Sequence, residues 1–425
     1  MQTIQQDTTF NAAFDKRLKR RYNAERRFKR LGLLAIFIAL GVLVFLLSTI
    51  IGNGYSAFRQ TVVQLDVSFD KSYFPDADLA RGDYQGIIKS SLLELFPEVT
   101  SRRDKHLLYS IASNGAGFKL MDMVLKNPKL INTRQKIWVP ASDDVDMFMK
   151  GNVDMSQPES SRRLKDKTVS WIMTLKSSER IKMKFNTTFF TSGDSREPEL
   201  AGILGAAKGS FYTLLITLIL SFPIGVAAAI YLEEFAPDNR LSALIEVNIN
   251  NLAAVPSIIF GLLGLAIFIN FWGIPRSTPL VGGLVLTLMT LPTIIIASRA
   301  SLKSVPPSIR EAALGIGASK IQTVFLHVLP LAMPGMLTGT IIGMAQALGE
   351  TAPLLMIGMV AFIVDIPGSI TDPSAVLPVQ IYLWADSPER AFTEKTSAAI
   401  MMLLAFLVVM NALAVLLRKK FEIKW

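Results

Sequence analysis

The chain has 425 residues, of which 51% are apolar and only 18% are charged, and its formal net charge is +10. A mean hydropathy of +0.40 is high for a soluble protein and predicts membrane-spanning segments. There is no cysteine, which excludes disulfides, thiolate metal sites and cysteine nucleophiles.

Six runs of about 20 residues or more lack Asp, Glu, Lys and Arg, which is the length that crosses roughly 30 Å of hydrocarbon. The predicted spans are 31–51, 209–232, 247–275, 277–298, 321–349 and 396–417. The first is interpreted as a retained anchor because it is longer than the apolar part of a signal peptide. A seventh apolar stretch, 351–364, either continues the fifth span or forms a re-entrant piece.

The charges predict the orientation of these spans. Residues 1–30 carry nine basic residues against three acids, and the tail carries Arg418, Lys419, Lys420 and Lys424 against Glu422. By the positive-inside rule both termini are cytoplasmic, and the basic loop at about 299–320 is cytoplasmic too. The loop 233–246 is also placed inside although it holds four acids against Arg240. The positive charge thus reports contact with a lipid bilayer and requires no nucleic acid.

Residues 52–200 have an ordinary soluble composition and are predicted to form an extracytoplasmic domain. Val63, Leu65, Val67 and Phe69 alternate with polar residues, as do Ile181, Met183 and Phe185, which predicts strands with one buried face. Residues 84–96 and 118–125 are predicted helices. The fold class is therefore an all-α polytopic membrane protein of six transmembrane helices, with a small α+β domain between the first two.

The most informative motif lies in the cytoplasmic loop between the fourth and fifth spans. Glu311-Ala312-Ala313 is followed by Gly317 and later by Leu329-Pro330. Pro306-Pro307-Ser308 predicts a helix start with Glu311 in the first turn, where the helix dipole favours an acid. Small residues in such a short helix allow another surface to approach closely. An ordinary interfacial helix rich in Ala and Gly is the alternative interpretation.

The motif resembles the coupling loop of ABC importer permeases, matching at Glu311, Ala312, Ala313, Gly317, Leu329 and Pro330, with His327 in place of the usual Ile. This resemblance implies that residues 306–320 bind in a cleft of a dimeric cytoplasmic ATPase. No phosphate-binding Walker A pattern occurs in this chain, so ATP and Mg would be bound by that partner and the chain itself would be no enzyme. Neither a catalytic residue nor a metal ligand is predicted.

A narrower resemblance covers almost everything after Ser195. The strings SREPELAG from Ser195, YLEEFAP from Tyr231, EVNINNLAAVPS from Glu246 and ALGETAPLL from Ala347 are similar to the phosphate-specific (Pst-type) permeases, A subunit, in their long form. The resemblance implies a bacterial inner-membrane protein with a homologous second permease and a periplasmic phosphate-binding protein as partners. It divides the chain into a basic segment (1–30), an anchor (31–51), an extracytoplasmic domain (52–200) and a type I importer permease domain (201–420).

Ionisable residues and broken helices at membrane depth are functional candidates. Glu350 lies between Gly349 and Pro353 and is predicted to pair with Arg299, or with Arg310 beside the motif. A guanidinium suits phosphate oxygens, so these arginines are candidate residues of the substrate path. A static ion pair that braces the bundle is the alternative.

Polar residues in the predicted spans extend this list. Asn248 and Asn251 share a helical face, and Thr213 lies in the second span. They are weaker candidates for the path because interhelical hydrogen bonds are the commoner use of such residues.

Other classes of function stay open at the level of sequence. Importers of sulfate, molybdate or phosphonate share the coupling motif. A membrane receptor would have a larger cytoplasmic domain, and an ATP-independent transporter would lack the coupling loop.

Overall fold

The structure is a computed structural model that describes residues 2–74 and 78–421, with the side chains of residues 18–74 and 78–420. The chain divides into two units between Asn53 and Gly54. The predictions for Glu422 and Lys424 lie outside the described residues.

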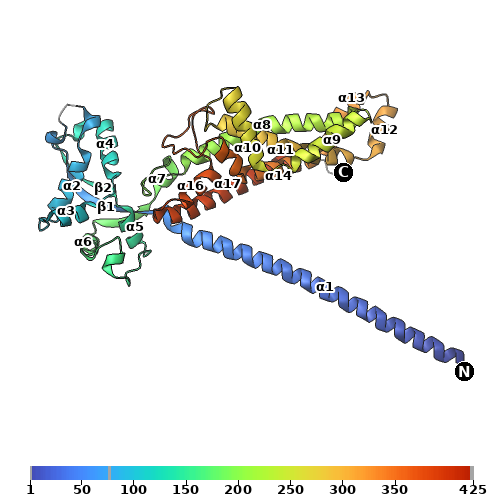
Figure 1. The fold of residues 1–425 in the computed structure, drawn as a ribbon, viewed down its shortest axis with the longest axis horizontal. Helices are drawn as coiled ribbons and strands as arrows, with labels where there is room; N and C mark the ends of the chain where they lie inside the picture. The colour runs from blue at the N-terminus through green and yellow to red at the C-terminus, as the bar shows by residue number, and fades with distance from the viewer. Residues whose placement is uncertain (1, 75–77, 422–425) are drawn as a thin grey trace. The chain divides into compact units, whose positions relative to one another are not determined.

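The first unit is the long helix α1 (Gln2–Gly54), shown in blue in Figure 1. Its helical backbone runs without a break through the basic segment and through the predicted anchor at 31–51. The stretch Leu18–Phe58 is long and apolar enough to cross a membrane.

The second unit begins with a small α+β domain. Its antiparallel sheet has the strand order β2-β1-β3. The strands are β1 (Arg59–Ser68), β2 (Arg134–Pro140) and β3 (Ile181–Phe185). The helices are α2 (Tyr84–Leu95), α3 (Arg102–Tyr109), α4 (Ala116–Lys126), α5 (Asp143–Met149), α6 (Asp166–Ser177) and α7 (Thr187–Thr191). Short 3-10 turns link them, the first being η1 (Tyr55–Phe58).

The first predicted strand is confirmed, since Val63, Leu65, Val67 and Phe69 are all fully buried in the core of this domain. The prediction for β3 is wrong in part. Ile181 is buried, but Met183 is 41% and Phe185 is 64% exposed. These two residues pair with the beginning of β1, opposite Thr61 and Arg59, whereas the helices cover the part of the sheet that includes Leu65 and Val67.

The rest of the second unit is a helical bundle, drawn from green to red in Figure 1. Its α-helices are α8 (Leu204–Ile230), α9 (Arg240–Ala253), α10 (Ser257–Gly264), α11 (Pro279–Lys303), α12 (Pro307–Gly315), α13 (Lys320–Thr323), α14 (Leu329–Gly349), α15 (Ala352–Met356), α16 (Leu377–Ala385) and α17 (Ala391–Phe421). Three π-helical segments are η6 (Tyr231–Phe235), η7 (Leu265–Phe271) and η8 (Val324–Val328).

Small residues allow the long helices to pack closely, as is usual for membrane helices. A Cβ atom added at Gly283 of α11 would lie 2.6 Å from Ile216 of α8, and one added at Gly339 of α14 would lie 2.2 Å from Ala297 of α11. Helix α11 is thereby held between α8 and α14.

Five helical stretches of the described chain are long and apolar enough to span a membrane, in agreement with five of the six predicted spans. The third predicted span, 247–275, is not one straight helix. It consists of α9 and of α10 with η7, which meet at an angle of 100°. Pro256 lies at the break with a ψ of 134°. Because a proline has no N–H to donate to the preceding turn, it cannot continue α9.

The stretch 351–364 does not continue the fifth span. Helix α14 ends at Gly349, and Glu350 is extended with ψ 125°. The five-residue helix α15 then packs against α10, with Pro353 beside Gly261.

Candidate coupling site and substrate path

Helix α12 carries the motif that the sequence singles out, and its ends are fixed by local chemistry. Pro306 precedes the helix with ψ 138°, and Pro307 occupies the first helical position, where no amide hydrogen is needed. Glu311 is the fifth residue of α12, so the prediction that it lies in the first turn is wrong. Its distance from the positive end weakens the dipole interaction on which that prediction relied.

Two residues beyond the end of α12, Gly317 has a φ of +92°, which is in the left-handed region that glycine adopts without a steric penalty. Its N–H donates to the Leu314 carbonyl at 3.0 Å, and the Ala318 N–H donates to the Ala313 carbonyl at 3.1 Å. No atom lies within 4 Å of a Cβ added at Gly317. The requirement for glycine is therefore conformational, since there is no crowding to relieve.

The motif divides between two faces of α12. Ala313 is buried, whereas Glu311 and Ala312 are exposed. Leu314 is 51% exposed, and Ile316, just beyond the helix, is 83% exposed. Two large apolar side chains beside an exposed acid form a surface suited to a partner protein.

Arg310 anchors α12 to the bundle. Its guanidinium binds Glu234 of η6, with Nη2 at 2.6 Å from Oε1, and donates to the carbonyls of Leu302 at 3.0 Å and Val305 at 2.8 Å. The Glu234 side chain is only 8% exposed. This one residue therefore joins α12 both to the end of α8 and to the end of α11, which is the bracing arrangement that the sequence left as an alternative.

Arg299, four residues before the end of α11, makes a second set of ion pairs. Its Nη1 lies 2.9 Å from Oε1 of Glu246 on α9, and its Nε lies 3.3 Å from Oε2 of Glu233. Lys303 is 3.7 Å from the same Glu233 oxygen. These residues line a pocket of about 700 Å³ between η6, α9 and α11.

The predicted pairing of Glu350 with Arg299 or Arg310 is wrong. Both arginines bind acids of η6 or α9, and the Glu350 side chain makes no hydrogen bond or ion pair with another described residue. Helices α11 and α14 run antiparallel, with Gly339 beside Ala297. At 1.5 Å per residue, this register puts Glu350 about 20 Å along α11 from Arg299.

Glu233, Glu234 and Glu246 are the partners that the sequence reasoning missed. The available signal was the loop at 233–246, whose four acids disagree with the positive-inside rule. Three of those acids neutralise Arg299 and Arg310, so the local excess of acid is structural.

The remaining candidates occupy two different environments. Asn248 and Asn251 lie exposed on α9, where Asn248 Nδ2 donates to the Leu244 carbonyl at 2.8 Å. Helix α9 has no buried residue, so this face is available to another subunit or to a path. Thr213 is 1% exposed, and it packs against Gly282 and Gly283 where α8 meets α11. That position is typical of a packing residue, and its role in a path stays a prediction.

Within the part of the chain that the structure describes, no group of three or more His, Asp or Glu side chains is placed to hold a metal ion. The arrangement around α12 combines an exposed apolar surface with the Arg310 brace to the ends of α8 and α11.

Comparison with known proteins identifies two regions. Residues 221–423 match the family described as binding-protein-dependent transport system inner membrane component, and residues 15–159 match a domain of unknown function, DUF3333. The second match begins inside α1 and ends within the α+β domain.

Individual relatives agree with the family match. The chain is 35% identical over 169 residues to the probable ABC transporter permease protein YqgI of Bacillus subtilis, covering 39% of this chain and 56% of that protein. It is 30% identical over 222 residues to the phosphate transport system permease protein PstA of Haemophilus influenzae, covering 52% of this chain and 77% of that protein. The chain thus spans between about half and three quarters of the length of these curated relatives.

Among solved structures, one of the MetNI methionine ABC transporter in an inward-facing conformation is similar with a TM-score of 0.42 and 18% identity, covering 51% of this chain and 95% of that one. The family assignment depends on the sequence matches, which cover most of the helical bundle. The chain therefore belongs to the binding-protein-dependent transport system inner membrane components, as a PstA-type ABC transporter permease in a long form that carries the DUF3333 domain.

Proposed function

We propose that this chain is a permease subunit of an ATP-driven phosphate importer in the bacterial inner membrane. It forms half of the translocation path with a homologous second permease. A dimeric cytoplasmic ATPase binds ATP and Mg, and a periplasmic binding protein delivers phosphate. The relatives named as phosphate transport system permeases support the substrate.

The exposed surface of α12 is the observation that carries the coupling part of this proposal. Leu314 and Ile316 offer apolar contacts, and Arg310 connects the same helix to the ends of α8 and α11. Closure of an ATPase dimer against α12 would therefore move both long helices. The basic residues in the cytoplasmic segments support an orientation with both termini and α12 inside.

Arg299 is the cation that we assign to the inner part of the path. Its partner Glu246 is 46% exposed and belongs to α9, a helix that packs on the bundle through α11 without burying any residue. A shift of α9 would separate Glu246 from the guanidinium and free N–H donors for phosphate oxygens. Because a guanidinium presents a planar fork, it matches an oxyanion better than Lys303 would.

The test is uptake of labelled phosphate into proteoliposomes that contain the full complex, with and without ATP inside. We expect accumulation only with ATP, and inhibition by unlabelled phosphate that exceeds inhibition by sulfate, molybdate or phosphonate. Arg299→Gln should abolish uptake while the complex assembles, whereas the neighbouring control Lys303→Gln should retain it.

Three results would contradict parts of this proposal. Stronger inhibition by another oxyanion would change the substrate. Uptake without ATP would indicate a transporter that is independent of ATP. Normal uptake by Arg299→Gln would remove that residue from the path.

A further inference from the structure

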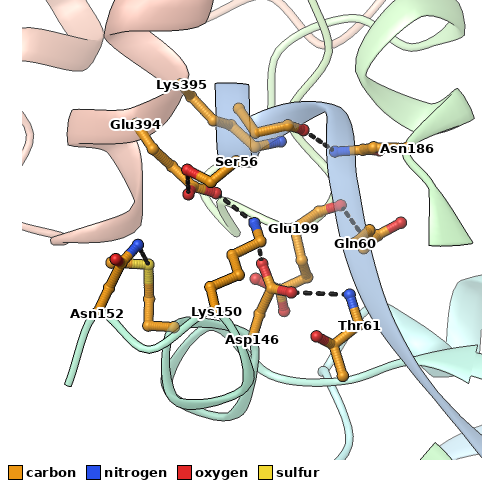
Figure 2. A network of polar contacts seen from close by, with 12 residues as sticks. Ser56, Gln60, Thr61, Asp146, Lys150, Asn152, Asn186, Glu199, Glu394 and Lys395 are labelled. Carbon is orange, nitrogen blue, oxygen red and sulfur yellow. Dashed lines mark hydrogen bonds and ion pairs between the residues drawn. The ribbon is translucent and has the colours of Figure 1, made fainter. Parts of the chain in front are cut away.

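A cluster of buried charges lies where the α+β domain meets the first turn of α17 (Figure 2). Lys150, which follows α5, is only 4% exposed, and its Nζ lies 2.6 Å from Oδ2 of Asp146 and 2.5 Å from Oε1 of Glu394. The other oxygens of these acids accept hydrogen bonds from the Thr61 N–H at 2.7 Å and the Ser56 hydroxyl at 2.6 Å. This part of the cluster is fully paired.

Two further charged residues complete the cluster without pairing with each other. Lys395 is 3% exposed, and its ammonium donates to the Ala201 carbonyl at 2.5 Å. Glu199 is 6% exposed, forms no ion pair with a described residue, and has an Oε2 atom that lacks a hydrogen-bond partner. The cluster therefore holds three acids against two lysines. Burial raises the pKa of the Glu199 carboxyl by more than Lys395 lowers it, and Glu199 is the acid of the cluster that makes no direct ion pair.

Glu199 lines a cavity of about 550 Å³ that is bounded by α2, α3, the start of α5 and the segment 196–199. Two other acceptor atoms on the cavity wall, Oγ of Ser142 and Oδ1 of Asp143, are buried and lack partners among the described residues. A buried acceptor without a donor is costly, so three such atoms around one cavity indicate a missing donor.

The basic side chains that line the same cavity are already engaged. Arg163 lies 2.8 Å from Glu389, Arg196 lies over the ring of Phe362, and Lys89 lies over the ring of Tyr109. Burial raises the pKa of the Glu199 carboxyl, and burial together with neighbouring carboxylates raises the pKa of Asp143 to about 7. Both directions are expected for acids that lack a counter-ion.

We propose that this cavity binds a small organic cation with a guanidinium head, which donates hydrogen bonds to Glu199, Asp143 and Ser142. Several N–H donors on one positive group would satisfy all three acceptors and supply the missing charge. A bare metal ion fits less well, because no three acidic or histidine side chains of the described chain are placed to hold one. The inference is independent of phosphate transport, so either can fail without the other.

The test is calorimetric titration of the full chain in lipid nanodiscs with Nα-acetyl-L-argininamide, called argininamide below, at a pH about one unit above the pKa of Asp143. The matched control ligand is Nα-acetyl-L-citrullinamide, called citrullinamide below, whose urea group is the neutral isostere of the guanidinium. Acetylation removes the α-ammonium from both ligands, so they differ only in the charge of the head group. We expect argininamide to bind and citrullinamide to bind far more weakly. Glu199→Gln and Asp143→Asn should each weaken argininamide at least about ten-fold, because each removes a charge-assisted hydrogen bond.

Asp122→Asn is the matched control variant, since Asp122 is an exposed acid on α4 that pairs with Lys126 away from the cavity. It should bind argininamide as the wild type does. Because Glu199→Gln can disturb folding, Asp143→Asn provides the second, more exposed site. The proposal is overturned if argininamide fails to bind the wild type at millimolar concentration, if citrullinamide binds equally well, or if both cavity variants bind argininamide unchanged.

Discussion

The brace made by Arg310 gives the sharpest prediction about α12. Arg310→Met removes a bidentate ion pair and leaves Glu234, whose side chain is 8% exposed, as a buried charge without a partner. Loss of one member of a fully buried pair costs about 3 to 5 kcal/mol. We take the lower end, about 3 kcal/mol, because the Arg310 side chain is 23% exposed.

A loss of that size raises the population of locally opened α12 about a hundred-fold, since 1.4 kcal/mol corresponds to a factor of ten. Hydrogen exchange of the amides at 307–315 measures this opening in the purified chain. In the assembled complex we expect ATP hydrolysis to become uncoupled from phosphate uptake. The double variant Arg310→Met with Glu234→Gln should restore most of the protection, because no buried charge is then left unpaired.

Lys303→Gln is the control, since the Lys303 side chain is 59% exposed and its pairing with Glu233 is long at 3.7 Å. Exposed pairs of this kind contribute little to stability. Unchanged exchange at 307–315 in Arg310→Met, or equal effects of Arg310→Met and Lys303→Gln, would refute the bracing role.

Three further predictions concern local stability. Gly317→Ala forces a Cβ into the left-handed region at a cost of about 1 kcal/mol, so amides near the end of α12 should exchange about five-fold faster. Gly315→Ala, in open space with ordinary helical geometry, should not speed this exchange, because alanine favours the helix more than glycine does. Lys150→Met leaves the buried carboxylates of Asp146 and Glu394 without their ion pair and should lower the free energy of unfolding of the second unit by about 3 to 5 kcal/mol. This loss is measured as a lower thermal transition of the second unit in detergent, and an unchanged transition would show that the cluster is not structural. The pKa of Asp143 is raised from 3.8 to about 7. Its protonation therefore stabilises the folded state below about pH 4, and that contribution is lost by up to about 1.4 kcal/mol per pH unit as pH rises toward 7. Thermal transitions of Asp143→Asn should lack this slope, and an identical slope in the variant would contradict the assignment.

Much of the fold can be predicted from short-range sequence patterns, such as the length of a charge-free run or the alternation of apolar and polar residues. Runs without charge predicted six spans, of which five are single long helices, and the alternation from Val63 to Phe69 predicted a buried strand. Both rules work because burial of a whole segment selects its residues. The alternation at Ile181 to Phe185 failed because an edge strand is covered only where helices lie over it, which depends on packing that is distant in sequence.

The break at Pro256 and the ion pairs of Arg299 illustrate what local patterns leave out. A proline predicts an interruption, but the 100° angle between α9 and α10 depends on the helices that surround them. Pairing of Arg299 with Glu350 looked reasonable from residue type alone. Their actual separation is set by the antiparallel register of α11 and α14, and the nearby acids of η6 and α9 therefore become the partners.

The proposed coupling to a cytoplasmic ATPase requires that this partner binds at α12. Because the chain has no cysteine, Ile316→Cys introduces a single thiol at a position that is 83% exposed in the native protein. Phe271→Cys is the control, since Phe271 is also largely exposed, at 82%. It belongs to η7, which comes before the first turn of α11, whereas α12 follows the last turn of α11.

The decisive measurement is photo-cross-linking of these variants to the ATPase subunit in membranes that contain the whole complex, after the introduced thiol has been labelled with a benzophenone maleimide. The account predicts a cross-link from Ile316→Cys that changes in yield when ATP is added, and none from Phe271→Cys. Failure of Ile316→Cys to cross-link in an active complex, or equal cross-linking from both positions, would contradict it.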